Sequence, residues 1–339
     1  MTRRHHLRPR ATFLLAVPAL AAAACGSGSS SATPAASGVP SSVTAQPNIV
    51  AEVPSSVKGT VLQIATDATY APNEFIDPNN GDIEGWDIDM GQAICKSMGL
   101  VCTFNNVTFD DIIAQLQAST PAEQAGGDKP RYQFSLSSWT PTAKREASGI
   151  DFISYASVGE GWTTKSGGPK VSTAADLCGH RVAVEAGTTE EMDAWGYEGK
   201  MVGGMAISGD TDHCSGNDMT VDSYQTQTLA DSALESGQDQ IGFLDVPVAQ
   251  YEVKVSGGKF IAGPLLAGGQ PCLVNPYGIA VVKGSALEAA ITDAMKYLIT
   301  SGAYNQILSN WNVKGVAIPA SQVTLNNNSS VGQPCVPSY

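Results

Sequence analysis

The sequence is poor in charge and poorest in positive charge. Charged residues make up 15% of the 339 residues, and 19 Lys and Arg face 32 Asp and Glu, for a formal net charge of -13. A surface that follows phosphates needs clustered Lys and Arg, so this balance argues against nucleic acid as a partner. The hydrophobic share of 42% excludes a disordered chain, and the length suffices for two lobes with separate cores.

Histidine is scarce as well, and the cysteines lack the CxxC spacing of a zinc site. Two histidines lie near the N-terminus, while His180 and His213 stand next to cysteines, so no Ser-His-Asp arrangement is evident. Six cysteines follow Cys25, and an even number in an exported chain favours disulfides. Sequence alone leaves many pairings open. The preferred set is Cys95–Cys102, Cys178–Cys214 and Cys272–Cys335. A metal site formed by the second pair and the two histidines is the alternative.

The N-terminal residues have the features of an export signal. Four arginines precede an apolar run over residues 11–24 that is too short to cross a bilayer comfortably and closes on Ala22-Ala23-Ala24-Cys25-Gly26. We therefore expect a signal peptide over 1–24, lipidation at Cys25 and a flexible tether over 25–57, rich in Ser, Ala and Pro. An ordinary cleaved signal is the alternative, and both general and twin-arginine export fit the arginines.

Beyond the tether, short apolar strands alternate with amphipathic helices. Strands are expected over 59–65, 101–104, 132–136, 181–185, 240–244 and 278–283. Helices are expected up to Gly99 and over 110–117, 227–235, 287–299 and 303–308, with a polar insertion at 121–130 and an irregular region at 196–220. This alternation predicts an α/β protein with a parallel or mixed sheet covered by helices.

One stretch suggests an anion-binding turn. Residues 137–145 offer hydroxyls at positions 138, 140 and 142 and then the guanidinium of Arg145, between an expected strand and a helix start. An arginine fork with neighbouring hydroxyl and backbone N–H groups suits a planar carboxylate. Taken alone, the stretch is equally well a capped helix start with a solvated Arg145, and Asp245 is equally well a helix cap.

Together these segments resemble the family 3 extracellular solute-binding proteins, the amino-acid receptors of ABC importers. The resemblance is carried by residues 64–72, 85–89, 138–145 and 182–189, by Asp245 with the Pro-Val-Ala that follows it, and by residues 277–281. It implies a two-lobed periplasmic-binding-protein-like fold of type II, with two α/β lobes joined by a two-strand hinge. The lobes would be 58–159 plus 278–315, and 160–277, with a disulfide-tethered C-terminal tail over 316–339.

The resemblance also assigns roles to ten residues. The ligand carboxylate would be bound by Arg145, Ser138, Thr140, Thr188 and Thr189, and the α-ammonium by Asp245. The ligand side chain would be surrounded by Asp67, Tyr70, Phe109 and Glu185. Two buried carboxylates, at 67 and 185, would be costly without a cation, so a cationic amino acid is predicted. The alternative is that Glu185 pairs with a lysine of the chain or takes the amide of glutamine.

The predicted function follows from these roles. We expect an exported, lipid-anchored monomer that captures a polar, cationic amino acid between closing lobes and delivers it to ABC permease subunits, without a cofactor, a metal or catalysis. One alternative is a dehydratase on the same fold, acting on prephenate-like acids, with Glu185 as the acid or base. Another is a sensory module that binds solute without transport.

Overall fold

The computed structural model describes residues 38–118, 131–206, 212–272 and 274–327. The expected signal peptide, Cys25, the start of the tether, the insertion at 121–130 and Cys335 lie outside these ranges. Within the ranges, no helix has both the length and the apolar character needed to cross a membrane.

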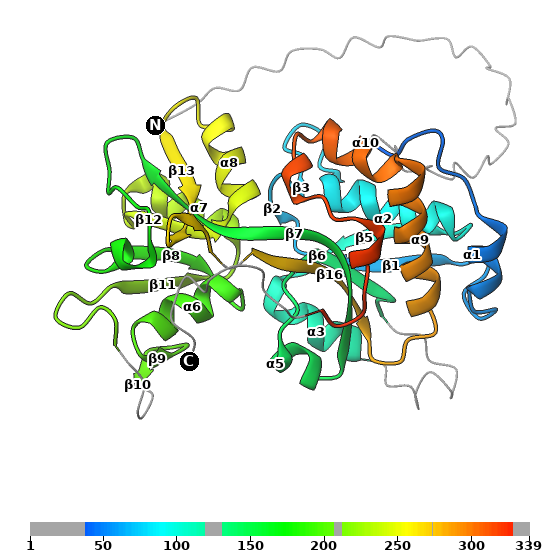
Figure 1. The fold of residues 1–339 in the computed structure, drawn as a ribbon, viewed down its shortest axis with the longest axis horizontal. Helices are drawn as coiled ribbons and strands as arrows, with labels where there is room; N and C mark the ends of the chain where they lie inside the picture. Colours follow the sequence, from blue (N-terminus) through cyan, green and yellow to red (C-terminus); the bar gives the residue numbers. More distant parts are fainter. Residues whose placement is uncertain (1–37, 119–130, 207–211, 273, 328–339) are drawn as a thin grey trace, which may run out of the picture. The chain divides into compact units, whose positions relative to one another are not determined.

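Helices and strands alternate along the described chain, as expected for an α/β protein (Figure 1). The helices are α1 Pro47–Glu52, α2 Trp86–Ser97, α3 Phe109–Gln117, α5 Ala143–Ala147, α6 Thr189–Tyr197, α7 Gln227–Ser236, α8 Val246–Val255, α9 Glu288–Ser301 and α10 Ala303–Asn310. The strands of the main sheet are β1 Val61–Thr66, β5 Val101–Asn106, β6 Phe134–Trp139, β7 Ile150–Lys165, β8 Arg181–Glu185, β11 Thr220–Tyr224, β12 Ile241–Asp245, β13 Phe260–Pro264 and β16 Val274–Val282. A small three-stranded sheet is formed by β2 Thr69–Tyr70, β3 Glu74–Ile76 and β4 Ile83–Glu84. Two short strand pairs are β9 Lys200–Met201 with β10 Met205–Ala206, and β14 Leu266–Ala267 with β15 Gln270–Pro271.

Two long strands connect the halves of the main sheet. The strand order is β11-β8-β12-β7-β16-β6-β1-β5, with β13 also paired to β7. The first part of β7 pairs with β16 from Val274 to Val282, whereas its last part pairs antiparallel with β12 and β13 (Figure 1). The sheet is mixed, because β1 runs parallel to β5 and β6 while β16 runs antiparallel to β6.

The two halves of the sheet pack separate hydrophobic clusters, and these clusters define the lobes. Alternate residues of the first half pack on opposite faces. Ile64 joins the core formed with α2, α9 and α10, while Ala65 joins the core formed with α3. The second half packs its own cluster, which includes Val182, Val184 and Phe243. We call the half with β1, β5 and β6 the first lobe and the half with β8, β11 and β12 the second lobe.

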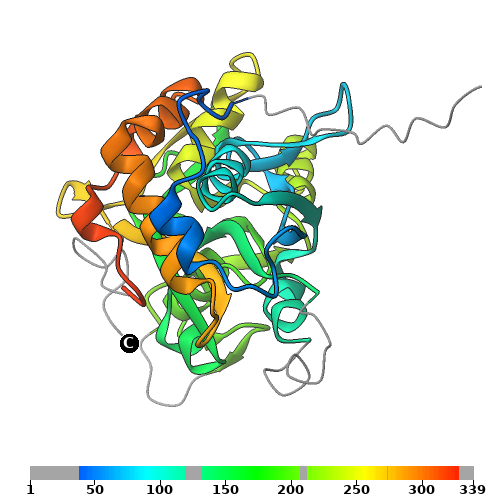
Figure 2. The same ribbon diagram turned by 90° about the vertical axis from the view of Figure 1, so that its right-hand side faces the viewer.

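Residues 38–57, predicted as part of the tether, pack on the first lobe. α1 buries Ile49 in the first core, with Val43 and Val53 beside it. Figure 2 shows α1 lying against α9. The expectation of a flexible tether up to residue 57 is therefore wrong for 38–57, because three apolar residues outweigh the Ser, Ala and Pro composition once α9 offers a surface.

The tail also packs on the first lobe. Val316 and Val323 belong to the first core, and Asn326 donates its backbone N–H to the carbonyl of Phe152 and accepts the Phe152 N–H through Oδ1 at 2.8 Å. These bonds satisfy the outer edge of β7, which would otherwise stay open. The region 196–220, expected to be irregular, contains the hairpin of β9 and β10, and β11 begins at its last residue.

Disulfides are present, as the cysteine count predicts. Cys95 of α2 is joined to Cys102 of β5, and Cys178 is joined to Cys214, with Cα–Cα distances of 6.1 and 5.3 Å. Because the thiols of Cys178 and Cys214 bind each other, the alternative metal site with two histidines is wrong. Cys272, the described half of the third expected pair, is fully buried in the core of the second lobe.

Candidate ligand-binding site

One pocket is lined by residues of both lobes. The lining residues are Asp67, Tyr70, Glu74, Phe109, Ser137, Ser138, Thr140, Arg145, Glu185, Thr188, Thr189, Glu190 and Asp245. Many of them follow the carboxyl ends of parallel strands, where open α/β sheets place their ligands. All ten residues with a predicted ligand role are in this set. Three acids and hydroxyls that the sequence did not single out, Glu74, Ser137 and Glu190, complete it.

The guanidinium of Arg145 packs against two aromatic rings, and Arg145 is not a solvated surface residue. It is 7% exposed, and its guanidinium carbon lies 4.9 Å from the ring centroid of Trp139 and 5.5 Å from that of Phe109. The two rings stack on each other at 4.1 Å. Burial lowers the pKa of Arg145 to about 10, so the group stays charged at neutral pH.

The guanidinium is oriented by two carbonyl groups. Nη1 donates to the carbonyl of Thr140 and Nη2 donates to the carbonyl of Gly187 at 2.8 Å, on the loop between β8 and α6 of the other lobe. Arg145 therefore connects the lobes directly. Gly187 has a φ of +80°, and a Cβ atom there would lie 1.8 Å from Oδ1 of Asp110, so this close approach needs glycine.

Most of the hydroxyls predicted to help the ligand carboxylate already donate within the protein. Ser138 Oγ donates to Glu74 Oε2 at 3.3 Å, and Thr189 Oγ1 donates to Glu190 Oε2 at 3.2 Å. Thr188 is the N-cap of α6: its Oγ1 accepts from the N–H of residue 191 and donates to the carbonyl of Glu185 at 2.7 Å. Near Thr188 and Thr189, the donors that remain for an anion are the backbone N–H groups of the first turn of α6.

Asp245 faces the pocket and does not cap α8. No α8 N–H donates to its side chain; instead Oδ2 accepts from the hydroxyl of Tyr277 at 2.5 Å and from that of Tyr70 at 3.0 Å. The helix-cap interpretation is therefore wrong. Burial raises the pKa of Asp245 to about 6, although the two tyrosine hydrogen bonds oppose the shift. Tyr277 belongs to one of the segments that carry the family resemblance, but its contact with Asp245, 32 residues away in sequence, has no local signal.

Asp67 and Glu185 differ in their partners. Asp67 Oδ1 accepts from Thr69 Oγ1 and Oδ2 accepts from the backbone N–H of Phe109, both at 2.7 Å, so hydrogen bonds within the protein offset part of the cost of burying Asp67. Glu185 is 3% exposed, and its Oε1 has no hydrogen-bond donor among the described residues. Burial, followed by the charge of Asp67, raises the pKa of Glu185 well above its usual value. No described lysine or arginine pairs with Glu185.

A pair of buried acids, Glu74 in the pocket lining and its neighbour Asp87, supports the pocket wall. Glu74 Oε1 accepts from Ser137 Oγ at 3.2 Å, while Asp87 Oδ2 accepts from Tyr155 OH at 2.7 Å and from the N–H of Ser138 at 3.1 Å. Burial raises the pKa of Asp87 to about 7, and burial with the charge of Asp87 raises that of Glu74 well above its usual value. The pair fixes Ser138, whose φ of +51° is a left-handed conformation that needs support.

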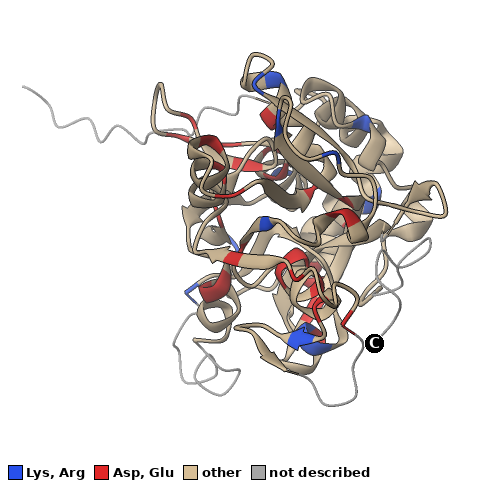
Figure 3. Cartoon of the chain, turned by 90° about the vertical axis from the view of Figure 1, so that its left-hand side faces the viewer, with Lys and Arg blue, Asp and Glu red and all other residues tan. Residues whose placement is uncertain are grey.

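Negative charge dominates the pocket. Five of the lining residues are Asp or Glu, and Arg145 is the single basic one. The same imbalance holds for the whole chain, and Figure 3 shows acidic segments widely spread and basic segments few. Buried carboxylates without counter-charges are costly, so the pocket favours a ligand that brings positive charge.

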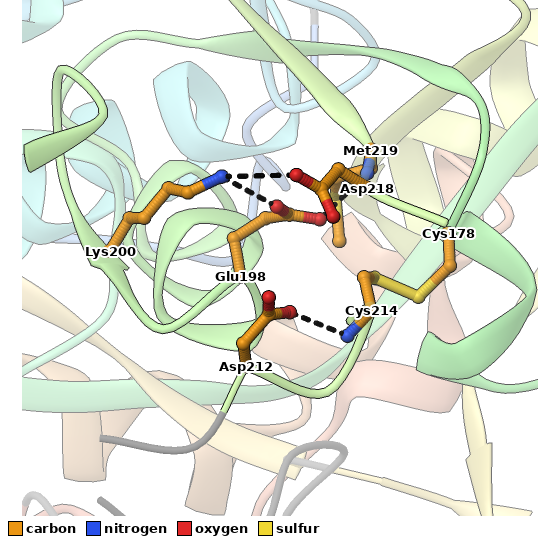
Figure 4. Close-up of a disulfide and its surroundings, with 7 residues drawn as sticks. All are labelled: Cys178, Glu198, Lys200, Asp212, Cys214, Asp218 and Met219. Atoms are coloured by element: carbon orange, nitrogen blue, oxygen red, sulfur yellow. Dashed lines mark hydrogen bonds and ion pairs between the residues drawn. A yellow bond between two sulfur atoms is a disulfide. The ribbon is translucent and has the colours of Figure 1, made fainter. Parts of the chain in front are cut away.

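A second acidic cluster lies next to the Cys178–Cys214 disulfide (Figure 4). Carboxylate oxygens of Glu198, Asp212 and Asp218 lie within 4.8 Å of one another. Lys200 Nζ lies 2.9 Å from Glu198 and 3.8 Å from Asp218 (Figure 4). The ammonium of Lys200 already supplies a cation, and Glu198 also accepts from the N–H of residue 219. The cluster is accounted for as an ion-pair network that stabilises the loop.

The fold and the pocket define a class of protein: a two-lobed receptor with a polar site between mixed-sheet lobes. Residues 62–314 match the model of the bacterial extracellular solute-binding proteins, family 3. The match covers well over half of the chain, and the protein belongs to this family. The expectations of fold class and family are confirmed.

Named relatives are receptors for basic amino acids. The arginine-binding protein ArgT of Corynebacterium glutamicum is 26% identical over 270 residues, which cover 79% of this chain and 80% of that protein. The lysine/arginine/ornithine-binding periplasmic protein of Escherichia coli is 27% identical over 252 residues, covering 73% and 85%. The structure of an ancestral arginine-binding protein bound to arginine has a TM-score of 0.60 and 27% identity, and the match covers 74% of this chain and 97% of that one. These relatives are binding proteins and not enzymes, which supports the same expectation for this chain.

Proposed function

We propose that this protein binds an amino acid with a cationic side chain and delivers it to the permease of an ABC importer. The observation that carries the proposal is the layout of the pocket. The guanidinium of Arg145 faces it from one lobe, the carboxylate of Asp245 from the other, and Glu185 adds a buried acid, one oxygen of which has no donor in the described part of the chain. A zwitterion matches the first two groups, and a cationic side chain matches the third.

Closure of the lobes would enclose this ligand. We place the crossing points of the chain near residues 159–160 and 277–278, within β7 and β16, so that both strands act as the hinge. The lobes already touch through Arg145 and the carbonyl of Gly187 and through Tyr70 and Asp245. A ligand that binds between them would strengthen these contacts by bridging the same groups.

Calorimetry on the exported form of the protein tests the ligand class. We expect arginine, lysine or ornithine to bind more tightly than glutamine, and glutamate to bind weakest, because the side chain of glutamate adds a second ligand carboxylate to a pocket that has five acids and a single basic residue. Tighter binding of glutamate than of arginine would exclude the proposal.

Glu185→Gln should change ligand preference. The substitution keeps the shape but removes the buried negative charge, so affinity for arginine is expected to fall about 10- to 100-fold. Citrulline, the neutral isostere of arginine, is the matched control, and its affinity should stay within a few fold or improve. Titration calorimetry measures the affinity of each ligand for the unaltered protein and for the variant. Equal losses for arginine and citrulline would show that Glu185 does not face the charged end.

We further propose that the protein is exported and held at the cell membrane by a lipid on Cys25, after removal of residues 1–24. The support is the small-residue sequence before Cys25 and membership of an extracellular family. Cys25→Ser should move the protein from the membrane fraction to the soluble extracytoplasmic fraction without changing ligand affinity in solution. Retention of the variant in the membrane fraction would contradict the anchor.

A further inference from the structure

Glu190 presents an unmatched oxygen to the pocket. The residue lies in the first turn of α6 and is 3% exposed. Its Oε2 accepts from Thr189 Oγ1 at 3.2 Å, whereas Oε1 has no N–H or O–H donor among the described residues. The carboxyl group of Asp245 is its hydrogen-bonding neighbour. Two carboxylates cannot satisfy each other, because both are acceptors, unless one of them carries a proton.

The surroundings offer little positive charge to relieve this contact. The titratable groups that act on Glu190 are Asp245 of β12, Asp193 of α6 itself, Glu160 of β7, Glu185 of β8, Tyr70 of β2 and Arg145 of α5. Four of these six are acids and Arg145 is the single cation. Its Nη1 and Nη2 atoms donate to carbonyl groups, and no ion pair among the described residues joins it to Glu190.

We propose that Glu190 and Asp245 share one proton in the empty pocket, and that the α-ammonium of the ligand displaces this proton when it binds. The inference rests on the proposed function, because it assumes an ammonium group at Asp245. Burial, followed by the negative charge of Asp245, raises the pKa of Glu190 well above its usual value, which agrees with a protonated pair. The pair titrates as a unit, so the proton belongs to both residues.

The exchange is balanced in protons and charge. The carboxylic O–H bond of the pair breaks, its proton passes to the solvent, and the ligand keeps its own ammonium protons. A cation beside both carboxylates favours their ionised forms and lowers the pKa of each. Binding therefore releases a proton, and affinity rises with pH over the range in which the empty pair is protonated. Above that range the affinity levels off.

Titration calorimetry with arginine at pH 7, in buffers with different ionisation enthalpies, counts the protons released. We expect Glu190→Gln to release about one proton per arginine fewer than the unaltered protein, because its amide supplies the missing N–H donor without a titrating group. Protons released by other pocket acids with a raised pKa, such as Glu185, are common to both proteins. Glu191→Gln is the matched control, since it removes the same charge from the next residue of the helix. Residue 191 accepts from Ser223 Oγ and the N–H of Gly187. Its variant should release protons as the unaltered protein does.

Each outcome is decisive. If arginine binds without proton release, the inference is overturned while the proposed function stands; if no basic amino acid binds, the proposed function fails first. Undiminished release by Glu190→Gln would assign the proton to another group and overturn the inference. If Glu190→Gln does not bind arginine, infrared difference spectra of the unaltered protein provide the test. We expect a carboxylic-acid band to disappear when arginine is added. If no such band disappears, the inference is overturned.

Discussion

Arg145→Ala is expected to lower the affinity for arginine at least about 100-fold. The guanidinium is buried against Trp139 and Phe109, and loss of one partner of a buried charge pair costs about 2 to 5 kcal/mol. Titration calorimetry measures the loss. Lys144→Ala removes the same charge from the preceding, exposed residue and should leave affinity within about twofold, since exposed charges contribute little.

Agmatine, which is arginine without the carboxylate, makes the test specific. If Arg145 binds the carboxylate, the unaltered protein should prefer arginine strongly over agmatine, and Arg145→Ala should bind both with similar affinity. A variant that loses both ligands equally would indicate a structural role, because Arg145 also links the lobes through the carbonyl of Gly187. Circular dichroism and the melting temperature of the variant separate that case from unfolding.

Asp245→Asn is expected to cause a loss of similar size through the opposite end of the ligand. The change removes a buried charge, and an amide oxygen still accepts the hydroxyls of Tyr70 and Tyr277, so the fold should persist. We expect arginine affinity to fall about 100-fold. Arginine without its α-ammonium, 5-guanidinopentanoate, should bind the variant no more weakly than it binds the unaltered protein.

The comparison of these two ligands separates charge recognition from packing. Equal losses for arginine and 5-guanidinopentanoate would place the ammonium away from Asp245, and the zwitterion model would be wrong. Asp218→Asn provides the control, because this acid lies in the exposed ion-pair network near the second disulfide and outside the pocket. Its variant should bind arginine as the unaltered protein does.

Position in the chain was enough to predict much of the site. Asp67, Glu185 and Asp245 each lie at or just after the carboxyl end of a strand, and within each lobe the parallel strands bring these ends to the side that lines the pocket. Arg145 lies a few residues after the carboxyl end of another strand, β6. The strands themselves were predictable because apolar residues alternate or run together between glycine, proline and hydroxyl residues.

Partners far apart in sequence could not be predicted. The helix dipole favours an acidic residue in the first turn of any helix, whether the residue is exposed or buried. The position of Glu190 in the sequence therefore does not show that its carboxyl group is buried. Thr188 and Ser138 have hydroxyls suited to a ligand, yet the structure engages them with Glu185 and Glu74. Such choices depend on which groups face each other after the lobes pack.

The first and last described segments also combine a local sequence signal with contacts that only the folded chain provides. The Pro47 start of α1 carried a helix signal, since proline is favoured in the first turn, but a six-residue helix is unstable without packing. Burial of Ile49 against the first core supplies the missing stability. In the tail, the pairing of Asn326 with Phe152 needs the open edge of β7, which is 174 residues away in sequence.

The sequence by itself determined the α/β class, the family, the acidic character and the residues at the strand ends, because these depend on local pattern and on motifs in order. Only the tertiary structure decided which hydroxyls are already engaged, that Asp245 faces two tyrosines, and that one oxygen of the buried Glu190 has no donor among the described residues. The physical reason is desolvation. The pKa and the partners of a carboxyl group depend on burial and on neighbours brought together by folding.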